Sequence, residues 1–344
     1  MALLRNALVL VLLSASSLWA VDGWLHLKGH DGPGKGKHIV LVSGDEEYRS
    51  EETMPMLAQI LSARHGFDCT VLFSMSEDGE YIDPNNGSSL EGTESLKGAD
   101  LMIIATRFRH PSDEAMANID GYLQSAKPVI GLRTATHGFN GIKGPWAHYN
   151  NGHKGEKWED GFGRHVLGEK WISHHGHHGK QATGGIVVED AKDHPVLSGV
   201  EESTIFGPSD VYGVRLPQPG DSKPLVLGAV LEGMNLGDKP IEGEKNEPMM
   251  PIVWTKSYTS DDGKTGKVVN TTMGASLDFV EPGLRRIVIN SVYWLLDMEV
   301  EPDLNIDFVT DFKPTKFRFI REKDFFKDKA MKPSDFALET AAAK

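Results

Sequence analysis

Cysteine is nearly absent from this chain, since Cys69 is the single one among 344 residues. An internal disulfide and a metal cluster held by several thiolates are therefore excluded. Basic residues are also scarce, because 36 Lys and Arg stand against 49 Asp and Glu, which gives a formal net charge of −13. An acidic chain is a poor partner for phosphate backbones, so we expect no nucleic-acid partner. With 39% hydrophobic and 25% charged residues, the composition is that of a globular protein, which excludes overall disorder, collagen and coiled coil.

Long hydrophobic runs are missing too. Residues 1–20 combine Arg5, a short apolar core and small residues up to Ala20, which is the pattern of a secretory signal peptide and is too short for a membrane span. We therefore expect a secreted or periplasmic protein with no stable membrane span after cleavage, and a retained N-terminal anchor is the alternative. Residues 21–37 are Gly-rich and unpatterned, and we interpret them as a leader.

Apolar runs and helical spacings alternate after this leader. Runs of apolar residues predict strands at residues 37–43, 69–73, 99–106, 127–132, 185–188, 225–231, 251–254 and 267–272. Helical spacing predicts helices at residues 51–65, 112–125 and 282–296. This order predicts one α/β domain over residues 38–298, with a doubly wound, mostly parallel sheet flanked by helices. The Phe-rich residues 299–344 are interpreted as an extended C-terminal tail laid on this domain.

Residues 138–182 interrupt the pattern with ten glycines, three tryptophans and many histidines. A long irregular insertion in a compact domain is usually functional or disordered, and the tryptophans argue against disorder. We expect this His-, Gly- and Trp-rich insertion to cover the site as a lid. Its tryptophans could stack on sugar rings or pack in the core.

Signatures of nucleophilic catalysis and phosphate binding are absent. The turn after residues 127–132 has neither the G-x-S-x-G motif of a nucleophilic serine nor a cysteine. Acidic residues follow the first predicted strand, where a phosphate-binding protein would have a glycine-rich loop. Polar segments beginning with Ser43, Arg107, Arg133 and Asn270 instead follow four predicted strands. Because doubly wound sheets bind ligands at the carboxyl ends of their strands, we expect these segments to meet in one site. Separate solvated loops are the alternative.

Most of the candidate residues lie in these segments, and Asp210 and Tyr212 come from a separate polar segment, residues 208–212. Carboxylates and imidazoles held in a cleft suit acid–base work on a polyol, and hydroxyl and guanidinium groups suit its binding. The catalytic candidates are His137, Asp210 and Glu46, and the substrate-binding candidates are Tyr48, Arg107, Arg133, Thr134 and Tyr212.

Histidine is concentrated in one part of the chain, since eight of 14 lie within residues 137–178. Imidazole is a common ligand for zinc, copper and nickel. In an extended segment His175 and His177 would face the same side, and His137, His165 or Asp210 could supply a third ligand. No tight signature such as H-E-x-x-H is present, so a solvated His-rich loop is the alternative. The metal candidates are His137, His175 and His177, for a divalent metal such as zinc.

Taken in order, several segments resemble the ThuA-like family, which is named for trehalose utilisation. They are residues 38–42 with the acidic loop and Tyr48, then residues 99–106, 129–139, 193–199, 209–212, 251–254 and 266–274, leading into 285–296. The resemblance implies a class I glutamine-amidotransferase-like, flavodoxin-like fold and a role near carbohydrate utilisation. The amidotransferase cysteine is absent, so glutamine hydrolysis is not implied.

Two functions are left open. The first is an exported protein that acts on a sugar or keto-sugar by acid–base or metal-assisted chemistry. The second is a non-catalytic module of the same fold that binds a saccharide, a metal or a protein. A small carbohydrate is the expected ligand, and a homo-oligomer is left open. Convergence of His137, Asp210 and residues 174–178 on one pocket would favour the enzyme, and dispersal would favour the module.

Overall fold

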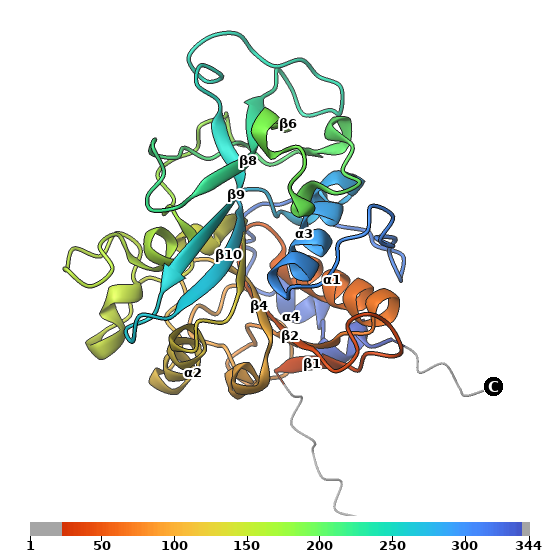
Figure 1. The fold of residues 1–344 in the computed structure, drawn as a ribbon. Helices are drawn as coiled ribbons and strands as arrows, with labels where there is room; N and C mark the ends of the chain where they lie inside the picture. The colour runs from red at the N-terminus through yellow and green to blue at the C-terminus, as the bar shows by residue number, and fades with distance from the viewer. Residues whose placement is uncertain (1–22, 339–344) are drawn as a thin grey trace, which may run out of the picture.

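The computed structural model describes residues 23–338. Its centre is one mixed sheet of ten strands in the order β1-β3-β2-β4-β5-β10-β9-β8-β6-β7 (Figure 1). The strands are β1 Trp24–Leu27, β2 His38–Gly44, β3 Asp68–Leu72, β4 Leu101–Thr106, β5 Val129–Leu132, β6 Thr183–Val187, β7 Phe206–Gly207, β8 Lys223–Val230, β9 Met250–Thr259 and β10 Thr265–Thr271. The α-helices are α1 Ser50–His65, α2 Asp113–Gln124, α3 Pro282–Leu295 and α4 Phe325–Lys329. The predicted α/β class agrees with this sheet and its flanking helices.

The parallel strands carry apolar side chains on both faces, and each face has its own core. In β2, Ile39 and Leu41 belong to one hydrophobic cluster and Val40 and Val42 to another. Because successive strand residues point to opposite faces, both faces need cover. Helices α1 and α3 pack into the first cluster and α2 into the second, on the two sides of the sheet (Figure 1).

The prediction of a mostly parallel sheet is wrong. Four strand pairings are parallel, and the other five pairings among the described residues are antiparallel. The largest antiparallel ladder joins β9 and β10 through a tight turn, in which Ser260 N–H donates to the carbonyl of Lys264 at 2.9 Å. Asp262-Gly263 occupies this turn with Gly263 at φ 84°, which is a hairpin signal that the apolar runs alone do not contain.

The segment interpreted as a leader contributes to the sheet. Its residues Trp24–Leu27 form β1, which pairs antiparallel with β3 at the edge. Residues 1–20, interpreted as a signal peptide, lie outside the described residues. Across residues 23–338, no helix combines the length and the apolar character needed to span a membrane.

The insertion at residues 138–182 is mainly packed structure. Tyr149, Trp158 and Phe162 are buried in the same cluster as α2, and the ring of Trp158 stacks on His165 at 4.3 Å. Burial of these rings fixes the first part of the insertion against the sheet. Its last part, from Trp171 onward, reaches the carboxyl edge of the parallel strands, where the lid was expected.

The C-terminal segment runs over α1 toward the same edge. Gln59 on α1 donates to the carbonyl of Phe336 at 2.9 Å, and Thr315 hydrogen bonds to Glu52. Farther along the edge, Phe317 is buried against Tyr48 with ring centroids 5.2 Å apart. The tail is therefore part of the site's surroundings.

Candidate functional site

A small cavity of about 90 Å³ lies at the carboxyl ends of the parallel strands. Its walls come from the loops after β2, β4 and β5, from the end of the insertion, from the segment after β7 and from the tail. The lining residues are Glu47, Arg107, Phe108, His137, Trp171, His174, Tyr212 and Phe319. Segments far apart in the sequence therefore converge at the carboxyl edge of the parallel strands.

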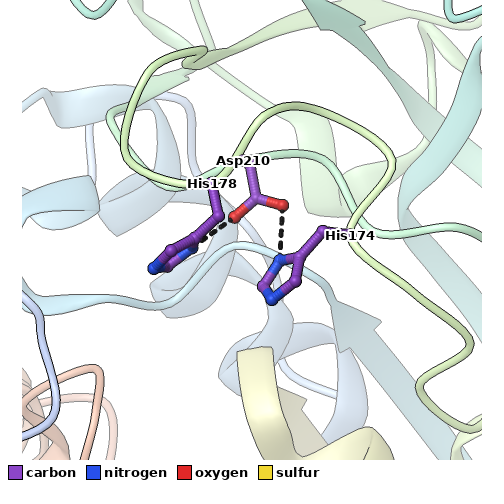
Figure 2. A group of neighbouring side chains, drawn as sticks. All are labelled: His174, His178 and Asp210. Carbon is purple, nitrogen blue, oxygen red and sulfur yellow. Dashed lines mark hydrogen bonds and ion pairs between the residues drawn. The ribbon is translucent and has the colours of Figure 1, made fainter.

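Behind the cavity, the fully buried carboxylate of Asp210 contacts one guanidinium and two imidazoles. His174 Nδ1 lies 2.8 Å from Oδ2, and His178 Nδ1 lies 3.1 Å from Oδ1 (Figure 2). Arg133 donates to Oδ1 at 2.9 Å. Burial alone would raise the pKa of Asp210, but Arg133 and the two histidines outweigh it and hold the pKa well below its usual 3.8. Asp210 is therefore a fixed negative charge that orients both imidazoles.

Arg133 is a structural residue in this arrangement. Its guanidinium lies 3.7 Å from the ring centroid of Tyr212 and 4.5 Å from that of Tyr48. It also donates to the carbonyls of Asp210 and Thr272 at 2.6 and 2.7 Å. With its side chain buried, Arg133 holds the walls together and does not line the cavity.

The loop after β2 is shaped by Asp45. Its Oδ1 accepts hydrogen bonds from the N–H groups of Glu47 and Tyr48 at 2.8 and 3.1 Å, and Thr134 donates to its Oδ2 at 2.7 Å. Such a side-chain-to-backbone turn fixes the direction of the following side chains. Here it brings Glu47 to the cavity, while Thr134 and Tyr48 act behind the wall.

Glu46 is not among the residues that line the cavity. Its carboxylate is bound by Arg107 and, at 2.6 Å, by Arg109. Glu46 thereby holds two arginines in place, and the acidic side chain that lines the cavity is its neighbour Glu47.

Glu47 and Arg107 form the charged side of the cavity. Arg107 Nε lies 3.5 Å from Glu47 Oε2, and the guanidinium sits 4.8 Å from the ring centroids of both Phe108 and Phe319. Burial raises the pKa of Glu47 above 4.5, and the charge of Asp45 adds to this rise. The guanidinium is therefore held beside the carboxylate and against two aromatic rings.

His137 forms the deep, uncharged side. Its Nδ1 lies 3.2 Å from the hydroxyl of Thr136, and its ring packs against Phe108 and Trp171 at 4.9 and 5.5 Å. Burial, with the positive charges of Arg107 and Arg133, holds the pKa of His137 well below 6.5. The imidazole is therefore neutral at physiological pH, and its Nε2 makes no hydrogen bond within the described part of the chain.

A clamp ties the tail to the loop after β2. Arg49, in the left-handed region at φ 63°, donates to the carbonyls of Glu46 and Arg318 at 2.6 and 2.8 Å. Arg318 N–H donates in turn to the carbonyl of Glu47 at 3.0 Å. This clamp sets the position of Phe319 over Arg107.

The structure brings together most of the residues expected from the sequence, in two layers. His137, Arg107 and Tyr212 line the cavity. The supporting layer behind them contains Glu46, Tyr48, Arg133, Thr134 and Asp210.

The expected metal set of His137, His175 and His177 is not assembled. The group whose donor atoms lie within 4.8 Å of one another is His174, His178 and Asp210. The expectation assumed an extended segment, whereas residues 175–176 bend and residues 178–180 turn, so positions 174 and 178 face the same carboxylate. His175 Nε2 instead lies 2.7 Å from the carbonyl of Lys245, and His177 is exposed.

Four residues of the cavity wall were not among the site candidates drawn from the sequence: Glu47, Phe108, Trp171 and Phe319. His174 and His178 belong to the tract 174–178 that was expected at the pocket, but they were not among the metal candidates. For the tail, a signal was present, because Phe317 and Phe319 alternate as in an extended segment with one face inward. No sequence signal separates Glu47 from Glu46, because the turn at Asp45 decides which of them faces the cavity.

No protein-family model matches the chain, and no curated protein matches it. Among solved structures, a protein described as ThuA-like from Bacteroides uniformis has 16% identity and a TM-score of 0.47, over 80% of this chain and 98% of that one. Another described as ThuA-like, from Parabacteroides merdae, has 16% identity and a TM-score of 0.46, over 83% and 98%. The chain is similar to ThuA-like proteins. A cytoplasmic protein from Salmonella typhimurium is also similar, with 10% identity and a TM-score of 0.40, over 75% and 98%.

Proposed function

We propose that this chain is an exported ThuA-like protein of carbohydrate utilisation that acts on a sugar or keto-sugar by acid–base chemistry. The observation that carries the proposal is the convergence of Glu47, Arg107 and His137 on one cavity. A carboxylate, a guanidinium and a neutral imidazole within one small space can accept a proton, hold a developing negative charge and bind a hydroxyl.

The cavity suits the reacting end of a sugar. At about 90 Å³ it is smaller than sites that enclose a whole drug-sized ligand, so the remainder of the sugar would lie outside. Trp171, Tyr212 and Phe319 supply ring faces at its wall, and aromatic faces suit the apolar faces of sugars.

Glu47 is assigned the base, because it is the carboxylate among the lining residues. With a keto-sugar, its oxygen accepts the proton from the carbon next to the carbonyl. The C–H electron pair becomes the double bond of an enediolate, and the carbonyl oxygen takes the negative charge beside Arg107. Return of a proton to that carbon restores a neutral sugar, and His137 orients a neighbouring hydroxyl.

The order of the parallel strands supports the finer fold assignment. β3-β2-β4-β5-β10 corresponds to the order 2-1-3-4-5 of flavodoxin-like sheets, whose ligands bind at the switch point between the first and third strands. Here β2 and β4 flank that point, and the loops after them carry Glu47 and Arg107. We infer a flavodoxin-like half extended by the antiparallel strands β9, β8, β6 and β7.

A thermal-shift screen of sugars and keto-sugars tests ligand binding in this cavity. A ligand that fits should raise the Tm of the wild-type protein, and His137→Ala should abolish this rise while remaining folded. His177→Ala, an exposed histidine outside the cavity, should keep the rise. If folded His137→Ala shows the same ligand-induced rise in Tm as the wild type, the ligand does not bind in this cavity. Binding without turnover of any sugar would favour the non-catalytic module.

A further inference from the structure

Three donor side chains meet beside the cavity and are not used by the acid–base proposal. The donor atoms of His174, His178 and Asp210 lie within 4.8 Å of one another, and the His–Asp pairs are only 2.8 and 3.1 Å apart (Figure 2). We propose that these three side chains bind one divalent cation of the zinc type. The proposal rests on the proposed function only for what the cation would do there.

The donor set fits zinc. Zinc in proteins takes imidazole nitrogen and carboxylate oxygen, with three protein ligands where a fourth position is kept for water or substrate. At zinc–nitrogen distances of about 2.0–2.1 Å, tetrahedral donors stand roughly 3.3 Å apart. The two His–Asp distances go to different oxygens of the carboxylate and are close to this spacing, and all three donor atoms lie within 4.8 Å of one another. Movements of the two imidazoles, which are about one-third exposed, would bring them onto one cation.

The carboxylate has room for a second cation besides Arg133. Arg133 and His178 approach Oδ1 of Asp210, whereas Oδ2 has His174 as its partner within the described residues. Oδ2 is therefore the carboxylate oxygen that Arg133 does not contact. Since deprotonated carboxylate and neutral imidazole are the forms that bind metals, the fixed charge of Asp210 suits this role.

The backbone holds both histidines against Asp210. The N–H groups of His175 and Gly176 point to the carbonyl of Val211 at 2.8 and 3.2 Å, which pins the bend beside the segment after β7. A Cβ at Gly176 would stand 3.2 Å from the Cβ of Asp210, a tight approach that glycine relieves. The close packing of this bend makes a defined site out of an exposed His-rich tract.

A second carboxylate orients one of the ligands. The other nitrogen of His178, Nε2, lies 3.4 Å from Oε1 of Glu47. Metal-binding histidines commonly donate their remaining N–H to a carboxylate, which fixes the ring. Because His174 also lines the cavity, a cation here would present its open position to the keto-sugar and polarise the carbonyl oxygen beside Arg107.

Zinc titration of the full chain, untagged so that no added histidines bind metal, tests the proposal. Calorimetry and elemental analysis of the dialysed protein should show one zinc per chain. His174→Ala and His178→Ala should each weaken zinc binding by at least about 100-fold, the upper end of the loss caused by outer-shell changes. His177→Ala is the matched control, because it removes an exposed histidine of the same tract and should leave the affinity unchanged.

The outcomes separate this proposal from the proposed function. Zinc binding that is absent in the wild type, or that falls equally in His177→Ala, would overturn the metal site. A preserved sugar-induced rise in Tm in that case would leave the sugar-binding proposal standing. Conversely, zinc binding with the expected variant pattern but no response to any sugar would support the metal site and contradict the sugar ligand. Circular dichroism of each variant confirms that it is folded.

Discussion

His174 Nδ1 lies 2.8 Å from Oδ2 of the fully buried Asp210. The same carboxylate neutralises Arg133, which is buried between Tyr48 and Tyr212. One side chain therefore both stabilises the fold at the strand ends and directs an imidazole to the cavity. Stability and function are coupled at Asp210 for this reason.

Asp210→Asn should destabilise the protein by about 3–5 kcal/mol, because it leaves the guanidinium of Arg133 buried without a counter-charge. Urea unfolding followed by circular dichroism measures this loss. Asp190→Asn, which changes an exposed carboxylate, should alter the unfolding free energy by less than about 0.5 kcal/mol. Equal stability of the two variants would show that Arg133 does not depend on Asp210.

Glu51 should make stability depend on pH near neutrality. Burial raises its pKa from 4.5 to about 7, despite Arg49 at 3.2 Å. Between these values the folded state holds a proton that the unfolded state has lost, so the free energy of unfolding falls as pH rises, by up to about 3 kcal/mol. The stabilisation that Glu51 contributes is fully present below about pH 4.5 and is lost above about pH 7.

Glu51→Gln cannot titrate and should remove this part of the pH dependence. Urea unfolding of both proteins at about pH 5 and about pH 7 isolates the contribution of Glu51 as a difference of differences. The wild type should lose more stability than the variant over this interval. Parallel pH profiles for the two proteins would be inconsistent with a raised pKa at Glu51.

Phe319→Ala should weaken the sugar-induced rise in Tm, because it removes the ring wall over Arg107. Phe325→Ala is the matched control, since Phe325 is half-buried in the same tail but packs on Phe326 outside the cavity. Phe317→Ala should differ from both variants, because this ring is buried. Its loss should lower the free energy of unfolding by about 3–5 kcal/mol. If Phe319→Ala responds to sugar as Phe325→Ala does, the tail does not shape the site.

The parallel half of the fold could be predicted from sequence because its signals are local. Apolar runs such as β2 and β4 must be buried on both faces, and the helical spacing of α1 and α3 supplies the cover. The antiparallel half was not recognised, because β9 and β10 are joined by an Asp-Gly turn that only the hairpin rule identifies. Strand β1 was missed for another reason, since its four residues lie in a Gly-rich segment.

The position of the site was predictable, but the orientation of its side chains was not. The rule that ligands bind at carboxyl strand ends correctly placed Arg107 and His137 at one cavity, and Tyr212, a candidate from a separate segment, lines it too. The choice of Glu47 over Glu46 depends on hydrogen bonds to Asp45, and the pairing of His174 with His178 depends on a bend pinned by Val211. These are tertiary contacts between segments far apart in the chain, so spacing alone does not contain them.

Hydrogen exchange of a keto-sugar in heavy water tests the central claim most directly. For a keto-sugar that raises the Tm, NMR should show that the wild-type protein exchanges the proton on the carbon next to the carbonyl for deuterium. This measurement does not require the final product to be known. Glu47→Gln should slow this exchange by at least about 100-fold, the usual contribution of a general base, and His177→Ala should leave it unchanged. If the wild type shows no exchange, or if Glu47→Gln exchanges the proton as fast as the wild type, the assignment of this cavity as an acid–base site is contradicted.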